Sequence, residues 1–184
     1  TRDGGEQHAD EFSAINPQHL IPVLRDGSRV IRQSLAIMEY LDETWPSHPL
    51  LPATARDRAR VRGLAQIICC DIHPLGNLRV LQHLQTDLGV SDEQRAQWSQ
   101  HWIRLGFETL EALLADHPST GEFCEGENPG LADCCLVPQV YNARRFGVDL
   151  APFPHIVRIE EACQALDAFR DAAPDRQPDA PAKS

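Results

Sequence analysis

A proline-rich stretch divides this sequence into two parts with different hydrophobic periods. Pro46, Pro49 and Pro52 fall within seven residues, and that density of proline prevents a continuous helix or strand. The part before the stretch contains two short apolar runs and one helical pattern, whereas the part after it is helical throughout. We expect an incomplete α/β domain over residues 1–45, a linker over 46–53, an all-helical domain over 54–172 and an extended tail over 173–184.

The first part is expected to hold a β-hairpin followed by a helix. Leu20–Leu24 and Arg29–Ile31 have the composition of short strands, and the Asp-Gly pair between them is a strong signal for a tight turn. Pro22 places the first strand at an edge or a bend, and the Ile21–Pro22 bond is a candidate for the cis form. Ser34 is a natural N-cap for the following helix. Because two strands cannot bury a sheet alone, partner strands must be missing or borrowed.

Four helices are expected after the linker. A capping-box pattern that begins at Thr54 opens a long helix, which reaches about residue 75 and is kinked by Pro74. Asp133 stands three residues after Gly130, which replaces the usual Ser or Thr of a capping box at the start of the third helix, and its carboxylate can still reach back to the backbone N–H of the cap, so Asp133 is interpreted as structural rather than catalytic. The other three helices are expected at Ser91–His117, Leu131–Phe146 and Pro154–Phe169.

Composition argues against several classes of function. Acidic residues outnumber basic ones by 27 to 17 in the 184-residue chain, and the net charge of -10 argues against binding to nucleic acid phosphates or to a membrane surface. No apolar run approaches the roughly 18 residues of a membrane-spanning helix. Every basic residue except Lys183 is arginine. The nucleotide composition of the genome is expected to account for most of these arginines. A few are candidates to hold carboxylates, because the guanidinium group is planar and permanently charged.

The six cysteines favour a cytoplasmic protein with reduced thiols. They occur as Cys69-Cys70, Cys124, Cys134-Cys135 and Cys163, without C-x-x-C spacing, and four of them stand in helical patterns among Ile, Leu and Val. Such thiols behave as small apolar side chains, so we expect reduced cysteines in the core. No metal site is expected, because the histidines and cysteines lack the spacing of zinc ligands. The chain opens with Thr1-Arg2-Asp3-Gly4-Gly5, which is not a basic and apolar leader, so no secretory signal is expected.

Several segments carry a resemblance to a known family. Asn16–Leu24, with its Ile-Pro pair, and Gln33–Leu41, which opens with Gln-Ser, resemble the second half of the thioredoxin-like domain of glutathione transferases. Cys70–Arg79, Leu131–Val140 and Asn142–Phe146 resemble the zeta class, which contains the maleylacetoacetate and maleylpyruvate isomerases. The resemblance implies the glutathione transferase fold and a glutathione-dependent cis-trans isomerase of aromatic-compound or tyrosine catabolism. The Asp-Ile-His-Pro and Asn-x-Arg pieces are closer to the maleylpyruvate enzymes, and the choice between the two substrates stays open.

The resemblance also implies a set of glutathione-binding residues. In this family the residue before the cis-proline offers its backbone to the cysteinyl part of glutathione, and the Gln-Ser pair binds the γ-glutamyl carboxylate. Independently of the family, a serine at a helix N-terminus supplies a hydroxyl and unpaired N–H groups, which suit an anion. The implied residues are Gln7, Ile21, Pro22, Gln33, Ser34, His73, Asn77, Leu78 and Arg79.

Two arginines are candidates to hold the substrate. Maleylpyruvate and maleylacetoacetate are dianions, and the resemblance assigns their carboxylates to Arg79 and Arg145, with Arg145 preferred over its neighbour Arg144. His73 and Asn77 are four residues apart, so we expect them on one face of the kinked helix. Taken without the family, such a polar pair more often satisfies backbone groups freed by the kink, and the arginines are ordinary solvated side chains.

One part of the family pattern has no counterpart in this sequence. The Ser-Ser-Cys-type motif that stabilises the glutathione thiolate is expected upstream of Thr1, and no catalytic residue is assigned within the chain. The chain is therefore expected to be either a fragment of an enzyme or a remnant that lacks the chemistry. Two further hypotheses are glutathione transfer or dehalogenation of small 2-halo acids, and a noncatalytic helical binding domain. The resemblance also implies a homodimer.

Overall fold

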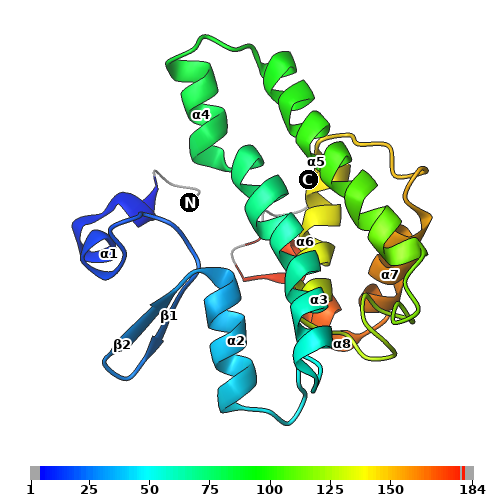
Figure 1. Cartoon of the computed structure of the whole chain (residues 1–184). Coiled ribbons are helices and arrows are strands. Elements are labelled where there is room, and N and C mark those ends of the chain that lie inside the picture. Colours follow the sequence, from blue (N-terminus) through cyan, green and yellow to red (C-terminus); the bar gives the residue numbers. More distant parts are fainter. Residues whose placement is uncertain (1–4, 179, 181–184) are drawn as a thin grey trace. The chain divides into compact units, whose positions relative to one another are not determined.

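The computed structural model describes residues 5–178 and residue 180 (Figure 1). The chain forms two compact units, residues 1–50 and 51–184, and the boundary between them falls within the proline-rich stretch. Within the described residues, no helix is both long and apolar enough to cross a membrane.

In the first unit, a β-hairpin follows two short helices and precedes a longer one. β1 (Val23–Asp26) pairs antiparallel with β2 (Arg29–Arg32), in a register that sets Val23 opposite Arg32. Gly27, in the turn, has a φ of 56°, which a glycine adopts without strain and which explains the Asp-Gly signal. The other elements of this unit are η1 (Glu6–His8), α1 (Asp10–Ile15) and α2 (Ser34–Thr44).

Two local details of the first unit differ from the sequence prediction. β1 begins at Val23 rather than at Leu20, because Pro22 has no N–H group to donate to a strand partner. The peptide bond before this proline is cis, as predicted. The predicted N-cap Ser34 is instead the first residue of α2, and the cap is Gln33, whose φ is 73°.

Four helices build the core of the second unit. Their facing sides bury Val61, Phe107, Val140 and Ile156, each at most 1% exposed. Caps predicted from the sequence begin two of these helices, since the side chain of Thr54 accepts a backbone N–H and Ser91 forms a complete capping box. The four are α3 (Ala55–Gln66), α5 (Asp92–Ala115), α6 (Leu131–Arg145) and α7 (Pro154–Gln164).

The long helix predicted through residue 75 is broken into several pieces. After α3 come a π-helical turn, η2 (Ile67–Ile72), a 3₁₀ turn, η3 (His73–Gly76), and a separate helix, α4 (Leu78–Thr86), which the sequence prediction missed. Pro74 has no N–H group, and its ring crowds the carbonyl four residues earlier, so a regular helix cannot continue through it. The N–H of His73 accordingly bonds to the carbonyl five residues back.

Helix α5 packs closely against this irregular segment. A Cβ atom at Gly106 would lie 2.2 Å from Cδ1 of Ile72, so only glycine permits the approach. The indole N–H of Trp98 donates to the carbonyl oxygen of Leu75 at 2.8 Å. Both contacts hold η2 and η3 on α5, and they fix the segment that carries His73.

The last predicted helix is also shorter than expected. α7 ends at Gln164, and Leu166 has extended backbone before α8 (Asp167–Asp171). The tail predicted to be extended contains a 3₁₀ turn, η4 (Pro174–Arg176), and the side chain of Gln177 donates to the carbonyl oxygen of Asp171 at 2.9 Å. Residues 179 and 181–184 of the predicted tail lie outside the described residues.

The cysteines are unbonded, and most are shielded from solvent. Cys124, Cys135 and Cys163 are buried, and two others are partly buried. Cys70 is exposed, so the prediction of core cysteines was wrong for this residue. The cause is helical geometry, because Cys70 lies two residues from both buried Ile68 and Ile72 and therefore faces the opposite side.

Asp133 has the structural role predicted for it. Its carboxylate is 1% exposed and accepts the backbone N–H groups of Gly130 at 2.8 Å and Cys124 at 2.9 Å. Burial raises the pKa of Asp133, while these two donors act in the opposite direction. One side chain therefore closes the start of α6 and anchors the loop that precedes it.

Asp133→Ala should lower the free energy of unfolding by about 2–4 kcal/mol, because it leaves two buried N–H groups without an acceptor. Urea unfolding of the whole chain measures this change. Asp149→Ala is the matched control, since Asp149 also accepts a backbone N–H, from Ala151 at 3.0 Å, but in an exposed loop. The control should cost less than about 1 kcal/mol. Equal losses in the two variants would contradict the anchoring role.

Candidate functional site

The N-terminus of α2 presents unpaired hydrogen-bond donors in the first unit. The first helical hydrogen bond runs from Ile37 to the carbonyl of Gln33 at 2.9 Å, which leaves the N–H groups of residues 34–36 without intrahelical acceptors. The Ser34 hydroxyl has no hydrogen-bond partner within the described residues. Gln33 is exposed, and its side chain donates to that of Gln18 at 3.1 Å. These donors lie where a carboxylate would be stabilised by the helix dipole.

The loop that approaches the cis-proline is held by a buried asparagine. Asn16 is 1% exposed, its side chain donates to the carbonyl of Leu20 at 2.7 Å, and its Oδ1 accepts the N–H of Gln18 at 3.2 Å. Ile21, the residue before the cis-proline, is 66% exposed. Sequence reasoning missed the part played by Asn16, although an Asn-Pro pair is a signal for a turn.

Gln7 has the features of a ligand-binding residue. Its side-chain Oε1 is buried and has no hydrogen-bond partner in the described part of the chain. Its backbone carbonyl lies 3.1 Å from Nδ1 of His19, and the same nitrogen lies 3.3 Å from the Ser13 hydroxyl. An unsatisfied buried amide is costly unless a ligand or water pairs with it. The first unit thus presents polar groups at Gln7 and at the start of α2, and the glutathione-binding role of both stays a prediction.

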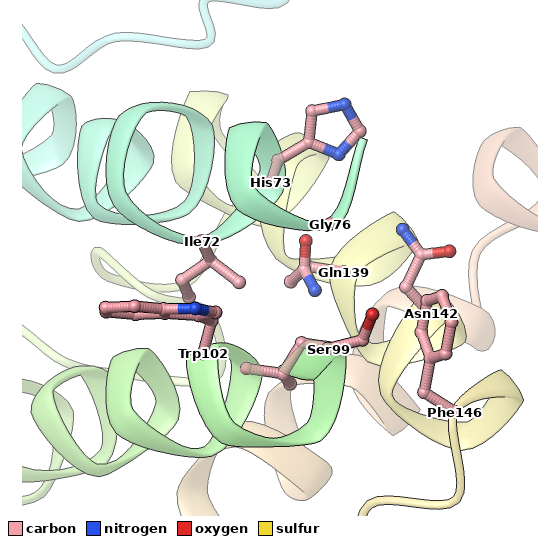
Figure 2. Close-up of a pocket in the computed structure, with 9 residues that line it drawn as sticks. Ile72, His73, Gly76, Ser99, Trp102, Gln139, Asn142 and Phe146 are labelled. Carbon is pink, nitrogen blue, oxygen red and sulfur yellow. The ribbon is translucent and has the colours of Figure 1, made fainter. Parts of the chain in front are cut away.

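In the second unit, His73 stands at the edge of a small pocket that is partly open to solvent (Figure 2). η2, η3, α5 and α6 supply its lining. His73 is exposed, and partial burial of its imidazole lowers the pKa of the ring below its ordinary value, which favours the neutral form at pH 7. The ring of His73 points away from the other labelled side chains in Figure 2.

Asn77, Leu78 and Arg79 lie at the start of α4 rather than along a continuous helix. The side chain of Asn77 accepts the N–H of Arg79 at 3.2 Å and caps α4. The expectation that His73 and Asn77 share one helix face was wrong, because Asn77 has extended backbone and the helix restarts there. Leu78 is 55% exposed, and Arg79 is exposed without an ion pair among the described residues.

The two adjacent arginines at the end of α6 have different surroundings. Arg144 forms a two-pronged ion pair with Glu160, at 2.9 and 2.8 Å, and Glu160 is only 5% exposed. This hydrogen bonding raises the pKa of Arg144. Arg145 has no ion pair within the described residues, and its guanidinium lies 5.6 Å from the ring centre of Phe146. Of the two, Arg145 is the one with its charge available for a ligand.

The second unit brings only some of its predicted residues to one place. His73 lines the pocket with Asn142 and Phe146, and Arg145 lies between these two in sequence at the end of α6. Asn77–Arg79 follow η3 directly but do not line the pocket. No group of three or more His, Cys, Asp or Glu side chains within the described residues is arranged to hold a metal ion.

Comparison with known proteins finds relatives along nearly the whole chain. Residues 2–44 match the family model described as glutathione S-transferase, N-terminal domain. The chain is 51% identical over 180 residues to a probable maleylacetoacetate isomerase of Vibrio cholerae, covering 98% of this chain and 83% of the relative.

Two solved structures are similar along nearly the whole chain. One is a holo structure of a maleylpyruvate isomerase, described as a bacterial zeta-class glutathione transferase, with a TM-score of 0.93 and 50% identity over 96% of this chain and 83% of that one. The other is a maleylacetoacetate isomerase of Methylobacterium extorquens with bound malonate and glutathione, with a TM-score of 0.94 and 44% identity over 98% of this chain and 85% of that one.

Arg144→Met should lower the free energy of unfolding by about 2 kcal/mol, because it leaves the buried carboxylate of Glu160 unpaired. Arg145→Met is the matched control at the next position and should change stability by less than about 0.5 kcal/mol. Urea unfolding at pH 7 compares the two variants. A larger loss of unfolding free energy in the Arg145 variant would contradict this assignment, because it would make Arg145 rather than Arg144 the arginine that stabilises the fold.

Proposed function

The chain belongs to the zeta-class glutathione transferases, the family of the maleylacetoacetate and maleylpyruvate isomerases, and we propose that it is a glutathione-dependent cis-trans isomerase of maleylpyruvate or maleylacetoacetate. The observation that carries this proposal is the high identity over 98% of the chain to a relative named for the reaction. Glutathione-bound and dicarboxylate-bound neighbours support the choice of cofactor and of substrate class.

The residues of the first unit are suited to hold glutathione. Ser34 and the free N–H groups at the start of α2 fit a carboxylate, and the unsatisfied amide of Gln7 fits a polar group. Ile21, the residue before the cis-proline, offers its backbone to glutathione. Pro22 and Gln33 are the other glutathione-binding residues proposed in the first unit. When bound, glutathione supplies a thiolate that adds reversibly to the conjugated double bond of the substrate, so that rotation about that bond becomes possible.

The second unit is suited to orient a dianionic substrate. Arg145 presents a planar fork of N–H donors without a competing carboxylate among the described residues, and Arg79 presents another at the start of α4. Two cations hold two carboxylates and so fix the direction of the double bond between them. His73 is neutral at pH 7, so it can donate or accept a hydrogen bond without adding charge. His73, Asn77, Leu78 and Arg79 are proposed to bind glutathione, as the family resemblance implies, and only Arg79 and Arg145 are proposed to hold substrate carboxylates.

Replacing Arg145 by Met should lower kcat/KM for the isomerisation by about 10- to 100-fold, the range expected for loss of a charge-assisted hydrogen bond. Glutathione affinity should stay unchanged, whereas Arg79→Met should weaken both substrate use and glutathione binding. Arg104→Met, which replaces an exposed arginine on α5, is the control.

The assay follows the isomerisation of maleylpyruvate and of maleylacetoacetate, with and without glutathione, and the turnover of a 2-chloro acid in parallel. Turnover of the chloro acid alone would favour dehalogenation, and retention on glutathione resin without any turnover would favour a binding domain.

We also propose that the protein is a cytoplasmic homodimer. Leu105 and Leu113 are eight residues apart on one face of α5, and their exposed fractions are 47% and 46%. Exposed apolar side chains on one helix face favour contact with a second copy. The unbonded cysteines are compatible with a reducing compartment.

Light scattering after gel filtration should give a mass twice the 20.5 kDa of the chain. Leu105→Arg combined with Leu113→Arg should shift the protein toward the monomer, since two buried charges oppose an apolar contact. Tyr141→Arg is the control, because Tyr141 is similarly exposed, at 50%, but lies on α6. A dimer that persists in the double variant would place the interface elsewhere.

A further inference from the structure

The pocket of the second unit contains polar groups that no protein atom satisfies. Nε1 of Trp102, on α5, is buried and has no hydrogen-bond partner in the described part of the chain. Gln139, on α6, is 3% exposed, and its carboxamide has no partner there either. Figure 2 shows this carboxamide between Gly76 and Ser99, with the indole of Trp102 close by. Since buried donors are nearly always paired, the indole N–H of Trp102 needs a partner other than protein, and the Gln139 carboxamide, which lines the same pocket, can bind that partner as well.

The chemistry of the lining selects a small neutral partner. An apolar occupant would leave both polar groups unsatisfied. An anion would be buried without a cation, because the pocket lining contains no lysine or arginine and His73 is neutral at pH 7. The enclosed part of the pocket has room for about one water molecule. Ser99 Oγ, which is buried and donates to the carbonyl of Arg95, can still accept one hydrogen bond.

We propose that the pocket is a binding site for one ordered water molecule, which accepts the indole N–H of Trp102 and pairs with the carboxamide of Gln139. The water joins α5 to α6 directly beneath the turn that carries Gly76 and His73. It adds to the direct bond between these helices, in which Gln100 donates to the carbonyl of Phe146 at 2.7 Å. The site is a part of the fold and is independent of whether the isomerase proposal holds.

Water contacts measured by NMR on ¹⁵N-labelled full-length protein test the proposal. The indole N–H of Trp102 should give a cross-peak to water with the sign of a long-lived bound molecule, and Gln139→Met should abolish it. Trp98 is an internal control, because its N–H already donates to Leu75 and should give no such peak. A crystal structure should place one water within about 3.2 Å of both Trp102 Nε1 and the Gln139 side chain. An empty pocket, or a direct hydrogen bond from Trp102 to Gln139, would overturn the proposal.

A second, independent observation concerns two cysteines. Sγ of Cys69 on η2 lies 3.6 Å from Sγ of Cys135 on α6, although they are 66 residues apart in sequence. Cys69 is partly exposed and Cys135 is buried. Their mutual hydrogen bond lowers the pKa of Cys69, which favours its thiolate, and the same bond raises the pKa of Cys135. An accessible thiol beside a buried one has the arrangement of an attacking and a resolving cysteine.

We propose that Cys69 and Cys135 are a site of reversible oxidation by hydroperoxides. The Cys69 sulfur attacks a peroxide oxygen, forming an S–O bond while the O–O bond breaks and hydroxide leaves. The Cys135 sulfur then attacks the Cys69 sulfur, the S–O bond breaks, and the departing hydroxide takes the Cys135 proton. Two thiols are thus oxidised to one disulfide, while one hydrogen peroxide is reduced to two waters. The bond would tie η2, next to His73, to α6.

Hydrogen peroxide treatment of the full chain, thiol blocking and mass spectrometry of unreduced peptides test this site. A peptide linking Cys69 to Cys135 should form with the loss of two free thiols, and dithiothreitol should reverse it. Cys135→Ser should abolish the link and leave a sulfenic acid on Cys69 that dimedone captures, whereas Cys163→Ser should retain the link. Oxidation confined to exposed Cys70, with no link to Cys69, would overturn the proposal.

Discussion

The missing N–H of Pro74 is the constraint on which the second unit depends. A regular helix cannot pass through this residue, so the chain widens into η2, tightens into η3 and restarts at Asn77. Helix α5 packs against the widened turn at Gly106, where the absence of a side chain lets Ile72 come close. One backbone defect therefore sets the position of His73 and the direction in which α4 leaves, and it leaves a small polar pocket under the turn.

Local sequence signals predicted the features that depend on neighbouring residues. The cis bond at Ile21–Pro22 and the hairpin turn at Gly27 are both set within a few residues, and both were predicted. The break after α3 was predicted only as a kink. Pro74 indicates that the helical hydrogen-bond pattern must be interrupted near it. The form of the interruption depends on a contact between Ile72 and Gly106, which are far apart in sequence.

The candidate site shows the same division between local and long-range information. Two neighbouring arginines look alike in the sequence, and the residue that separates their roles is Glu160, one helix later, whose buried carboxylate pairs with Arg144. Asn77 was predicted from the family to face a ligand, yet the side chain also caps α4. Family resemblance identifies which positions of the sequence are candidate site residues. Only the structure shows which hydrogen-bond or ion-pair partners their side chains already have.

Those partners also decide which arginines of this acidic chain remain available to a ligand. The net charge of the chain does not tell which arginines can bind a carboxylate, because some of them are already paired with acidic residues. Arg144 pairs with Glu160, and Arg60 pairs with Glu125 in the loop before α6. What counts for a substrate is an arginine whose donors are not already committed within the fold. Arg145 meets this condition among the described residues because α6 turns its neighbour toward Glu160. The buried ion pair at Arg144 thus both stabilises the end of α6 and leaves the adjacent charge available for a carboxylate.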